Sequence, residues 1–562
     1  MTFDEYFNEE EIINYLSRQR AKLARKRSKE HIMVGISQKS KKKLIIKQDK
    51  KNDLFNIMPP RRLWVRISKE KRYRNDCLIN SIERNCKVIY STIKKHRKDS
   101  IKYSYMEKLE LFISNIYKSI NNKHFRFLSP NIQPVPKKRG KCICRPIASY
   151  KLKDNLINCL TNKYLVNYLD DLFYEHSYAF RAKRFVNDKK KALNHHDAFK
   201  VIIEYLKNNT GKKIFVAECD MQKFYDTVNH KIVMKQFRKL CFRKIFKERC
   251  DKRAKEIFKA YLNCYNFNEN VYKLNDDKKH FEKLHIDNAK YDWINENNLK
   301  ELYKKSEDYK FVGIPQGGAL SGLIANIVLN YADEKVLKLK DENLLYIRYC
   351  DDMIIMHTDR KKCENALEAY QKSLKKLKLF PHLPENIKYG KIFWDVKSKE
   401  TYEWSYDNIP WVGFVGYEIN RNGDVRVRKS SLKKEMNKQF ELVDSIRSAI
   451  SNKINISKGT IVESAYSRLN GMAVGRVGLC NYQDYENDMC WVKGFQLLNK
   501  NKHSSLQLKS LDRFKNLNLH RLFKYLEKVD DSESIGKNKK IRRNRELIFY
   551  GKPFSYFYQA LK

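Results

Sequence analysis

Three short segments of this chain combine acidic, aromatic and glycine residues in patterns that could support catalysis. The first ends an apolar stretch at Asp220 and places an aromatic residue, Tyr225, five positions later. The second is the glycine-rich run 313–321, which leads into an apolar helical segment. The third places Asp351 and Asp352 side by side between two apolar stretches, where we expect a hairpin turn.

Adjacent carboxylates at a hairpin turn raise each other's pKa unless a cation neutralises them. A pair of divalent metal ions does so, since hard cations prefer oxygen ligands. If the strand that ends at Asp220 lies beside the hairpin that carries Asp351, their carboxylates converge on two metals. Two such ions, about 3.5 to 4 Å apart, activate an attacking 3′-hydroxyl and stabilise the leaving pyrophosphate. The acids therefore predict polymerase chemistry.

Each segment alone has a simpler interpretation. An Asp-Asp pair in a loop is usually a solvated turn or a helix cap, and two glycines before a helix more often form a turn than a phosphate-binding loop. The three segments occur in a fixed order, however, and each falls on the secondary structure that its role requires. This agreement favours the polymerase interpretation over three unrelated turns.

The elements that must position these segments alternate between short apolar strands and helices. We expect strands over 214–217, 344–347, 353–356 and 412–416, and a long helix around 327–329. Strand, helix, hairpin, helix and strand in one layered unit predict an α+β fold with a split βαβ arrangement.

The three segments resemble the palm motifs of the reverse transcriptases, which have the forms D-x-x-x-F-F/Y-D, x-P-Q-G-x-x-x-S and Y-x-D-D. Residues 414–417, Phe-Val-Gly-Tyr, resemble the short F-L-G-Y-like turn that follows these motifs. Residues 145–147, Arg-Pro-Ile, with Asp154, and the run 177–181, Ser-Tyr-Ala-Phe-Arg, are similar to fingers motifs of the group II intron and bacterial branch. The resemblance covers about residues 125–450.

The resemblance implies an α+β right-hand polymerase with a ferredoxin-like palm. We expect a basic helical N-terminal extension over 1–95, helix-rich fingers over 96–213, a palm over 214–425, and a helical, basic thumb and C-terminal region over 426–562. The first two palm motifs are further apart than the family pattern leads us to expect. The polar stretch 266–308 is therefore expected to be an insertion.

The resemblance also assigns metal ligands. It implies that Asp220 and Asp351 are the principal ligands, that Asp352 is the third acid, and that the Met221 carbonyl helps to hold the metal on the nucleotide side. The expected cofactor is a pair of Mg²⁺ ions, for which Mn²⁺ could substitute.

For the nucleotide, the resemblance places a steric gate at Tyr225, whose ring would clash with a ribose 2′-hydroxyl and so favour deoxynucleotides. An Arg is suited to the triphosphate because its fork matches phosphate oxygens; a surface ion pair is the alternative for such a residue. The further expected contacts are Gln316 in the nucleotide pocket, Arg145 and Lys138 at the triphosphate, and Lys388 or, alternatively, Lys391 as the lysine that follows the hairpin.

The charge of the chain agrees with a nucleic-acid partner. Its 562 residues include 116 Lys and Arg against 66 Asp and Glu, a net charge of +50 at pH 7, which favours binding to a polyanion. A hydrophobic content of 42% excludes a disordered chain. Because no apolar run is long enough to span a membrane, we expect a cytoplasmic protein with no membrane partner.

The subgroup is indicated by features outside the palm. Group II intron proteins often add a Cys- and His-containing endonuclease, and this sequence has no CxxC pair from which to build one. The long N-terminal extension and the helical C-terminal region look most like bacterial defence-associated, abortive-infection reverse transcriptases. This implies an RNA-directed DNA polymerase that acts in antiphage defence.

The implied partners are dNTPs, a DNA product and an RNA, which we expect to be a dedicated non-coding RNA that serves as template or scaffold. An oligomer or an accessory protein is also compatible with the sequence. Two alternatives remain open: a group II intron maturase that lacks the endonuclease, and an RNA-binding scaffold whose palm is unused.

Overall fold

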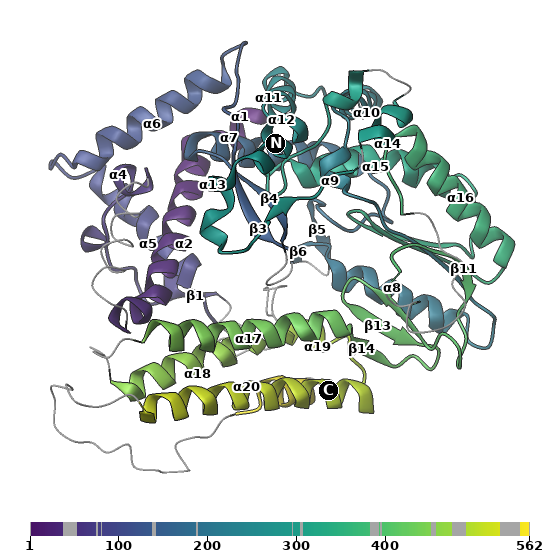
Figure 1. Cartoon of the computed structure of the whole chain (residues 1–562). Helices are drawn as coiled ribbons and strands as arrows, with labels where there is room; N and C mark the ends of the chain where they lie inside the picture. Colours follow the sequence, from purple (N-terminus) through teal and green to yellow (C-terminus); the bar gives the residue numbers. More distant parts are fainter. Residues whose placement is uncertain are drawn as a thin grey trace. The chain divides into compact units, whose positions relative to one another are not determined.

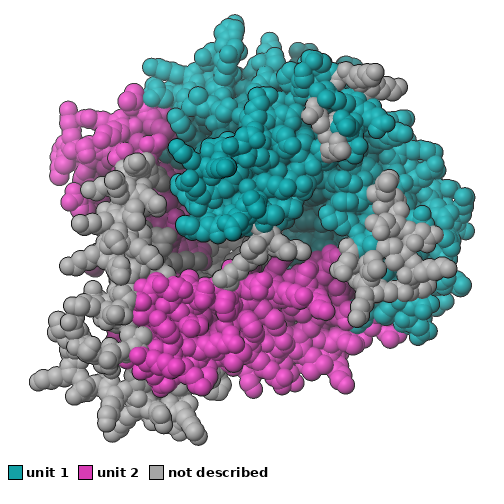
Figure 2. All heavy atoms as spheres, viewed as in Figure 1, with its two compact units in different colours: residues 1–11, 113–415 teal, residues 12–112, 416–562 magenta. Residues whose placement is uncertain are grey.

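The chain forms two compact units in the computed structural model (Figure 2). Unit 1 comprises residues 1–11 and 113–415, and unit 2 comprises residues 12–112 and 416–562. The structure describes residues 2–36, 53–74, 77–79, 81–137, 142–186, 189–244, 246–294, 296–303, 307–382, 393, 396–450, 457–474, 491–528 and 551–560.

The centre of unit 1 is a four-stranded antiparallel sheet. Its strands are β7 (Phe215–Cys219), β9 (Leu345–Tyr349), β10 (Asp352–His357) and β11 (Lys399–Glu403), in the spatial order β11-β7-β10-β9. The strands are rich in β-branched and aromatic residues, which suit a pleated, buried surface. The predicted α+β fold with a ferredoxin-like split βαβ palm is confirmed. Its fourth strand, however, is β11 and not the strand that we expected over 412–416, which is β12 (Trp411–Phe414) and lies outside this sheet.

The register of this sheet brings the acidic motifs together. In the pairing of β7 with β10, Cys219 faces Met353. Asp220 follows Cys219 at the end of β7, and Asp352 precedes Met353 as the first residue of β10. Because the two strands are antiparallel, Asp220 and Asp352 lie next to each other. Strands β9 and β10 are joined by a two-residue turn that contains Asp351. All three acids therefore lie at one end of the two central strands.

Helices cover this sheet (Figure 1). Helix α16 (Arg360–Lys376) packs against β7, β10 and β11, α15 (Ser321–Leu337) packs against α16, and α8 (His195–Asn208) packs against β9. Nearly every residue of α15 is buried. A helix buried on all sides is expected to be apolar all round, as this one mostly is, so its few polar residues must find partners inside the fold.

A second sheet of unit 1 consists of β3 (Asn131–Pro136), β4 (Ile143–Ser149) and β8 (Lys290–Tyr291), in that order. Strands β3 and β4 are antiparallel, whereas β8 joins β4 in parallel. Strand β8 belongs to the stretch 266–308, which we predicted to be an insertion. The stretch thus completes this sheet.

Unit 2 has a helical core. Helices α17 (Lys429–Ala449), α18 (Lys458–Val474) and α20 (Lys502–Lys528) bury apolar side chains against one another. Helix α21 (Pro553–Ala560) is attached to α20 by Asp512, whose carboxylate accepts the backbone N–H groups of Phe554 (3.1 Å) and Ser555 (2.9 Å). The core residues of these three helices are Val443, Ile446, Ala449, Ile461, Ala465, Leu469, Leu519, Leu522 and Leu526.

The two units contain further helices and strands. The α-helices are α1 (Phe3–Tyr6), α2 (Glu9–Ile36), α4 (Leu54–Ile57), α5 (Ser81–His96), α6 (Ser104–Ile120), α7 (Leu152–Leu169), α9 (Phe224–Thr227), α10 (His230–Arg243), α11 (Lys252–Asn263), α12 (Phe267–Asn270), α13 (Lys278–Phe281), α14 (Glu296–Leu302) and α19 (Trp491–Phe495). The strands are β1 (Tyr73–Arg74), β2 (Cys77–Leu78), β5 (Lys183–Val186), β6 (Lys189–Ala192), β12 (Trp411–Phe414), β13 (Tyr417–Asn420) and β14 (Val425–Val427).

The four segments that we predicted from the sequence, with boundaries at 95, 213 and 425, remain predictions. Among the described helices, none is both long and apolar enough to cross a bilayer.

Candidate active site

The three predicted acids lie around the turn between β9 and β10. Asp351 is half-buried in the turn and Asp352 is exposed at the start of β10. Asp220 is held from both sides of its backbone, because its N–H donates to Ser398 Oγ (3.0 Å) and its carbonyl accepts the His382 N–H (2.9 Å). Burial raises the pKa of Asp351, and the negative charge of Asp220 raises it further.

This electrostatic coupling is what a cation-binding pair of carboxylates requires, because a divalent ion would relieve it. In the described part of the chain, however, no three His, Cys, Asp or Glu side chains are grouped so that they could hold a metal ion. The chemistry of the donors fits Mg²⁺, since carboxylate oxygens are its preferred protein ligands.

The predicted gate residue contacts the same turn. The Tyr225 hydroxyl lies 3.1 Å from Cys350 Sγ, and burial, together with neighbouring Cys350 and Asp351, raises the pKa of Tyr225. The Tyr225 carbonyl accepts the backbone N–H of Ile314 at 2.7 Å. The first motif is therefore in contact with both the hairpin and the glycine-rich segment.

Gln316 is held by its side chain and by its backbone. Its Nε2 donates to Asp226 Oδ1 (2.8 Å), and its carbonyl accepts the N–H of Ala148 on β4 (2.8 Å). Asp226 is only 3% exposed, and burial raises its pKa to about 6 despite the bond from Gln316. Gln316 thus joins the palm motif to the sheet formed by β3, β4 and β8.

The glycine-rich segment is closely packed and requires a glycine at its first position. Gly313 has a φ of +98°, and a Cβ at this position would lie 2.7 Å from Phe267 Cβ. The turn is closed by Ser321, whose hydroxyl donates to the Pro315 carbonyl (2.6 Å) and also bonds the Tyr261 hydroxyl (2.8 Å). These contacts fix the loop immediately before α15.

The other residues expected at the nucleotide or the metal lie in different parts of the structure, or outside the described residues. Arg145 is exposed on β4, where it pairs in register with Val135, two residues from Ile147, which forms a β-bridge with Gln316. Met221 is 4% exposed and forms a β-bridge with Pro381. Lys138, Lys388 and Lys391 lie outside the described residues.

Sequence reasoning missed a group of charges beside Asp226. Lys223 Nζ forms an ion pair with Asp292 Oδ2 at 2.8 Å. Lys137, at the end of β3, is close enough that burial and the positive charge of Lys223 lower its pKa to about 8, while Asp292 and Asp226 oppose that shift. Asp292 follows β8 directly, so the stretch predicted as an insertion supplies a charged group to this site. Its sequence carries no motif that could have revealed this.

A second missed residue is Lys397, whose Nζ lies 3.7 Å from Asp220 Oδ2. It also lies 3.1 Å from His382 Nε2. Lys397 precedes β11, the strand beside β7, and this position follows only from the sheet order.

Comparison with known proteins agrees with this geometry. The family model described as "Reverse transcriptase (RNA-dependent DNA polymerase)" matches residues 135–382, which include all three motifs. The chain carries a reverse transcriptase domain. It is an RNA-directed DNA polymerase. No curated protein matches this chain by sequence.

Three solved structures with some similarity to this chain are telomerases. Apo telomerase from Candida tropicalis is 14% identical, with a TM-score of 0.34 over 79% of this chain and 74% of that one. Telomerase from Candida albicans with a TWJ fragment of telomeric RNA is 14% identical, with a TM-score of 0.29 over 79% and 69%. C. tropicalis telomerase truncated from its C-terminal domain is 15% identical, with a TM-score of 0.32 over 62% and 68%.

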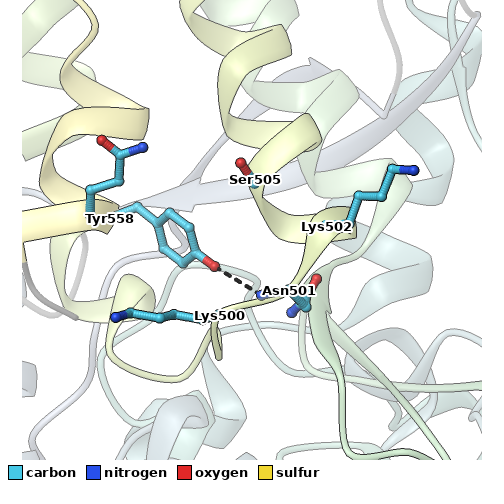
Figure 3. A pocket seen from close by; sticks show the side chains of 6 residues that line it. Lys500, Asn501, Lys502, Ser505 and Tyr558 are labelled. Carbon is cyan, nitrogen blue, oxygen red and sulfur yellow. Dashed lines mark hydrogen bonds between the residues drawn. The ribbon is translucent and has the colours of Figure 1, made fainter.

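Unit 2 contains a separate cavity of about 400 Å³ (Figure 3). The Tyr558 hydroxyl donates to the Asn499 carbonyl (2.6 Å) and accepts the Asn501 N–H (3.4 Å). No residue of the polymerase motifs lines this cavity. Its lining residues are Lys500, Asn501, Lys502, Ser505, Tyr558 and Gln559.

We predict that Asp226→Asn removes a pH dependence of stability. Because the pKa of Asp226 in the fold is about 6, above its usual value near 4, the folded state binds this proton more tightly than the unfolded state. The contribution of Asp226 to stability is therefore full below pH 4 and is lost as the pH rises through 6. Urea unfolding should show wild type losing up to about 3 kcal/mol relative to Asp226→Asn between pH 4 and pH 7. Equal pH dependence in the two proteins would contradict the buried position of Asp226.

Proposed function

We propose that this reverse transcriptase synthesises DNA at the site formed by Asp220, Asp351 and Asp352. The observation that carries the proposal is the β7–β10 register, which places these acids from separate motifs at one end of the palm sheet. The three carboxylates, with the Met221 carbonyl, would hold two Mg²⁺ ions, and Mn²⁺ could replace them. When bound, such ions activate the primer 3′-hydroxyl and stabilise the leaving pyrophosphate.

We further propose roles for the residues around the acids. Tyr225 would border the sugar C2′, because its ring is fixed against the hairpin turn at Cys350. Gln316, held by Asp226, would line the nucleotide pocket. Arg145 on the exposed face of β4, together with Lys137, would hold the triphosphate. Arg145 lies near the Gln316 segment, and Lys137 lies near Asp226. For Lys138 and Lys388, contacts with the nucleotide stay predictions from the sequence.

Asp351→Asn tests the catalytic assignment. The amide keeps the size of the side chain but removes its charge, so kcat in primer extension with Mg²⁺ and dNTPs should fall at least about 1,000-fold, equivalent to about 4 kcal/mol of transition-state stabilisation. Asp359→Asn is the matched control, because Asp359 lies past the other end of β10 and its side chain caps α16 by accepting the Lys362 N–H (2.9 Å). Wild-type activity in Asp351→Asn would refute the assignment.

Tyr225 gives a separate test of sugar selection. Tyr225→Ala should reduce the ratio of kcat/KM for a dNTP over the matching rNTP by about 10- to 100-fold, because the ring that excludes the 2′-hydroxyl is gone. Tyr225→Phe keeps the ring and loses only the hydroxyl contact with Cys350, so it should discriminate as wild type does. An unchanged ratio in Tyr225→Ala would show that another residue is the gate.

We also propose that the enzyme acts in bacterial antiphage defence and copies, or is assembled on, a dedicated non-coding RNA. Support comes from the +50 charge, the helical regions on both sides of the polymerase domain, and the lack of CxxC pairs for an endonuclease. A group II intron maturase without its nuclease is the second candidate, favoured only by the fingers-motif resemblance.

Sequencing of the RNA that copurifies with the enzyme, and of the DNA made from it, separates these roles. Defence predicts one dominant non-coding RNA, and a reduction in phage plaques by wild type that Asp351→Asn does not give. An intron RNA whose splicing survives Asp351→Asn would support the maturase instead. A mixture of cellular RNAs in proportion to their abundance would contradict a dedicated template.

A further inference from the structure

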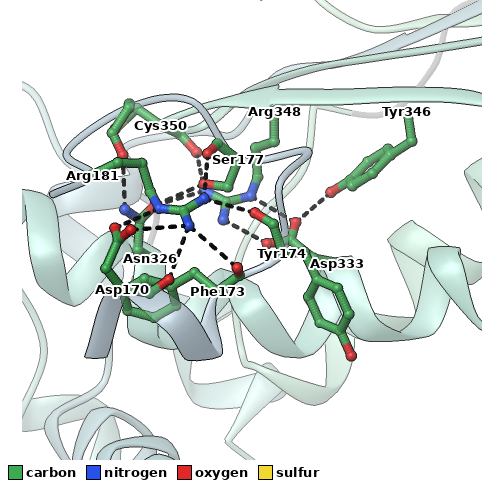
Figure 4. Close-up of polar contacts among 11 residues, drawn as sticks. Asp170, Phe173, Tyr174, Ser177, Arg181, Asn326, Asp333, Tyr346, Arg348 and Cys350 are labelled. Carbon is green, nitrogen blue, oxygen red and sulfur yellow. Dashed lines mark hydrogen bonds and ion pairs between the residues drawn. The ribbon is translucent and has the colours of Figure 1, made fainter. Parts of the chain in front are cut away.

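A buried ion pair lies directly behind the turn that carries Asp351. Arg348 on β9 and Asp333 on α15 each have 0% side-chain exposure, and they form two parallel bonds, Nε to Oδ1 (2.7 Å) and Nη2 to Oδ2 (2.6 Å) (Figure 4). Buried pairs of this kind add little net stability, because removing both charges from water costs about as much as their attraction returns. A role in stability alone is therefore a weak account of this pair.

The third nitrogen of the guanidinium reaches the turn itself. Arg348 Nη1 donates to the Cys350 carbonyl at 2.8 Å. Cys350 has a φ of +61°, a left-handed conformation that is unfavourable for a residue with a side chain and persists only where its surroundings impose it. The Cys350 carbonyl belongs to the peptide that leads into Asp351. The bond from Arg348 therefore fixes that peptide plane.

The guanidinium is held in place from several directions. Asn326 Oδ1 on α15 accepts from Arg348 Nη1 (3.3 Å) and from Ser177 Oγ (3.1 Å), and Asn326 Nδ2 donates to the Ala179 carbonyl (2.8 Å). The Tyr346 hydroxyl donates to Asp333 Oδ1 at 2.6 Å. The backbone of Arg348 is also bonded to the same loop, since its N–H donates to the His176 carbonyl (2.9 Å) and its carbonyl accepts the Tyr178 N–H (3.0 Å).

This accounts for the Ser-Tyr-Ala-Phe-Arg run at 177–181. Arg181 is itself buried, pairs with Asp170 at 2.7 Å, and donates to the carbonyls of Tyr174 and Ser177, both at 2.8 Å (Figure 4). The run therefore packs as a rigid loop behind the hairpin, and its polar groups extend the network around Arg348.

We propose that Arg348 is a positioning residue that holds the peptide between Cys350 and Asp351 and thereby sets the direction of the Asp351 carboxylate. The inference rests on the proposed catalytic role of Asp351. Arg is required because one planar fork serves the Asp333 carboxylate and the turn carbonyl at once, whereas the single ammonium of Lys does not match this geometry.

The test compares Tyr346→Phe with the triple variant Tyr346→Phe, Asp333→Leu, Arg348→Met. The triple variant leaves neither an unpaired buried charge nor an orphaned Tyr346 hydroxyl, so its melting temperature should stay close to that of Tyr346→Phe. Its kcat should fall at least about 10-fold with the KM for dNTP changed less than about 3-fold, because the acid is misdirected while the nucleotide contacts remain. Tyr346→Phe should keep wild-type kcat, since it leaves the bond from Arg348 to Cys350.

Equal kcat in Tyr346→Phe and the triple variant would overturn the proposal. A kcat that falls in each variant only in proportion to its loss of melting temperature would overturn it too. If the triple variant melts below the assay temperature, Arg348→Lys takes its place in the same comparison, with the same expected loss of kcat and the same overturning result. Asp351→Asn is measured in parallel. An active Asp351→Asn refutes the catalytic role itself, whereas an inactive one beside an active triple variant refutes only the positioning role.

Discussion

The antiparallel pairing of β7 with β10 is the constraint on which the rest of the site depends. With Cys219 opposite Met353, Asp220 emerges beside Asp352 and one position from the turn that contains Asp351. A slip of one residue would turn each side chain to the other face of the sheet and separate the acids. The buried apolar residues of both strands, including Ile354 and Val216, resist such a slip.

A second layer of contacts makes this arrangement specific. Tyr225 touches the turn from one side and Arg348 bonds it from within the core, while Gln316 connects the glycine-rich loop to β4 and to Asp226. These contacts determine where a few polar atoms point, which is the property that an electrostatic site needs, because charge stabilisation depends on fixed donors and acceptors.

The sequence was sufficient for the parts of the site that are local. An apolar strand ending at Asp220, a glycine-rich turn before a helix, and an Asp pair in a hairpin are all visible in short windows, and the ferredoxin-like palm follows from their order. The partners of Arg348, Lys223 and Asp220 were not visible in this way. Asp333, Asp292 and Lys397 are ordinary charged residues in polar or helical stretches, and only the tertiary fold brings them to the site.

The short strand β8 has a consequence for how the chain folds. It pairs with β4 through Ile143 and Lys290, residues that are far apart in the sequence, and it covers the first part of an edge of β4 whose later part is bonded by Gln316. Pairings between distant residues form slowly because a long loop must close first. During synthesis, we therefore expect this edge of β4 to stay open, and able to pair with another chain, until the segments around Lys290 and Gln316 have been made.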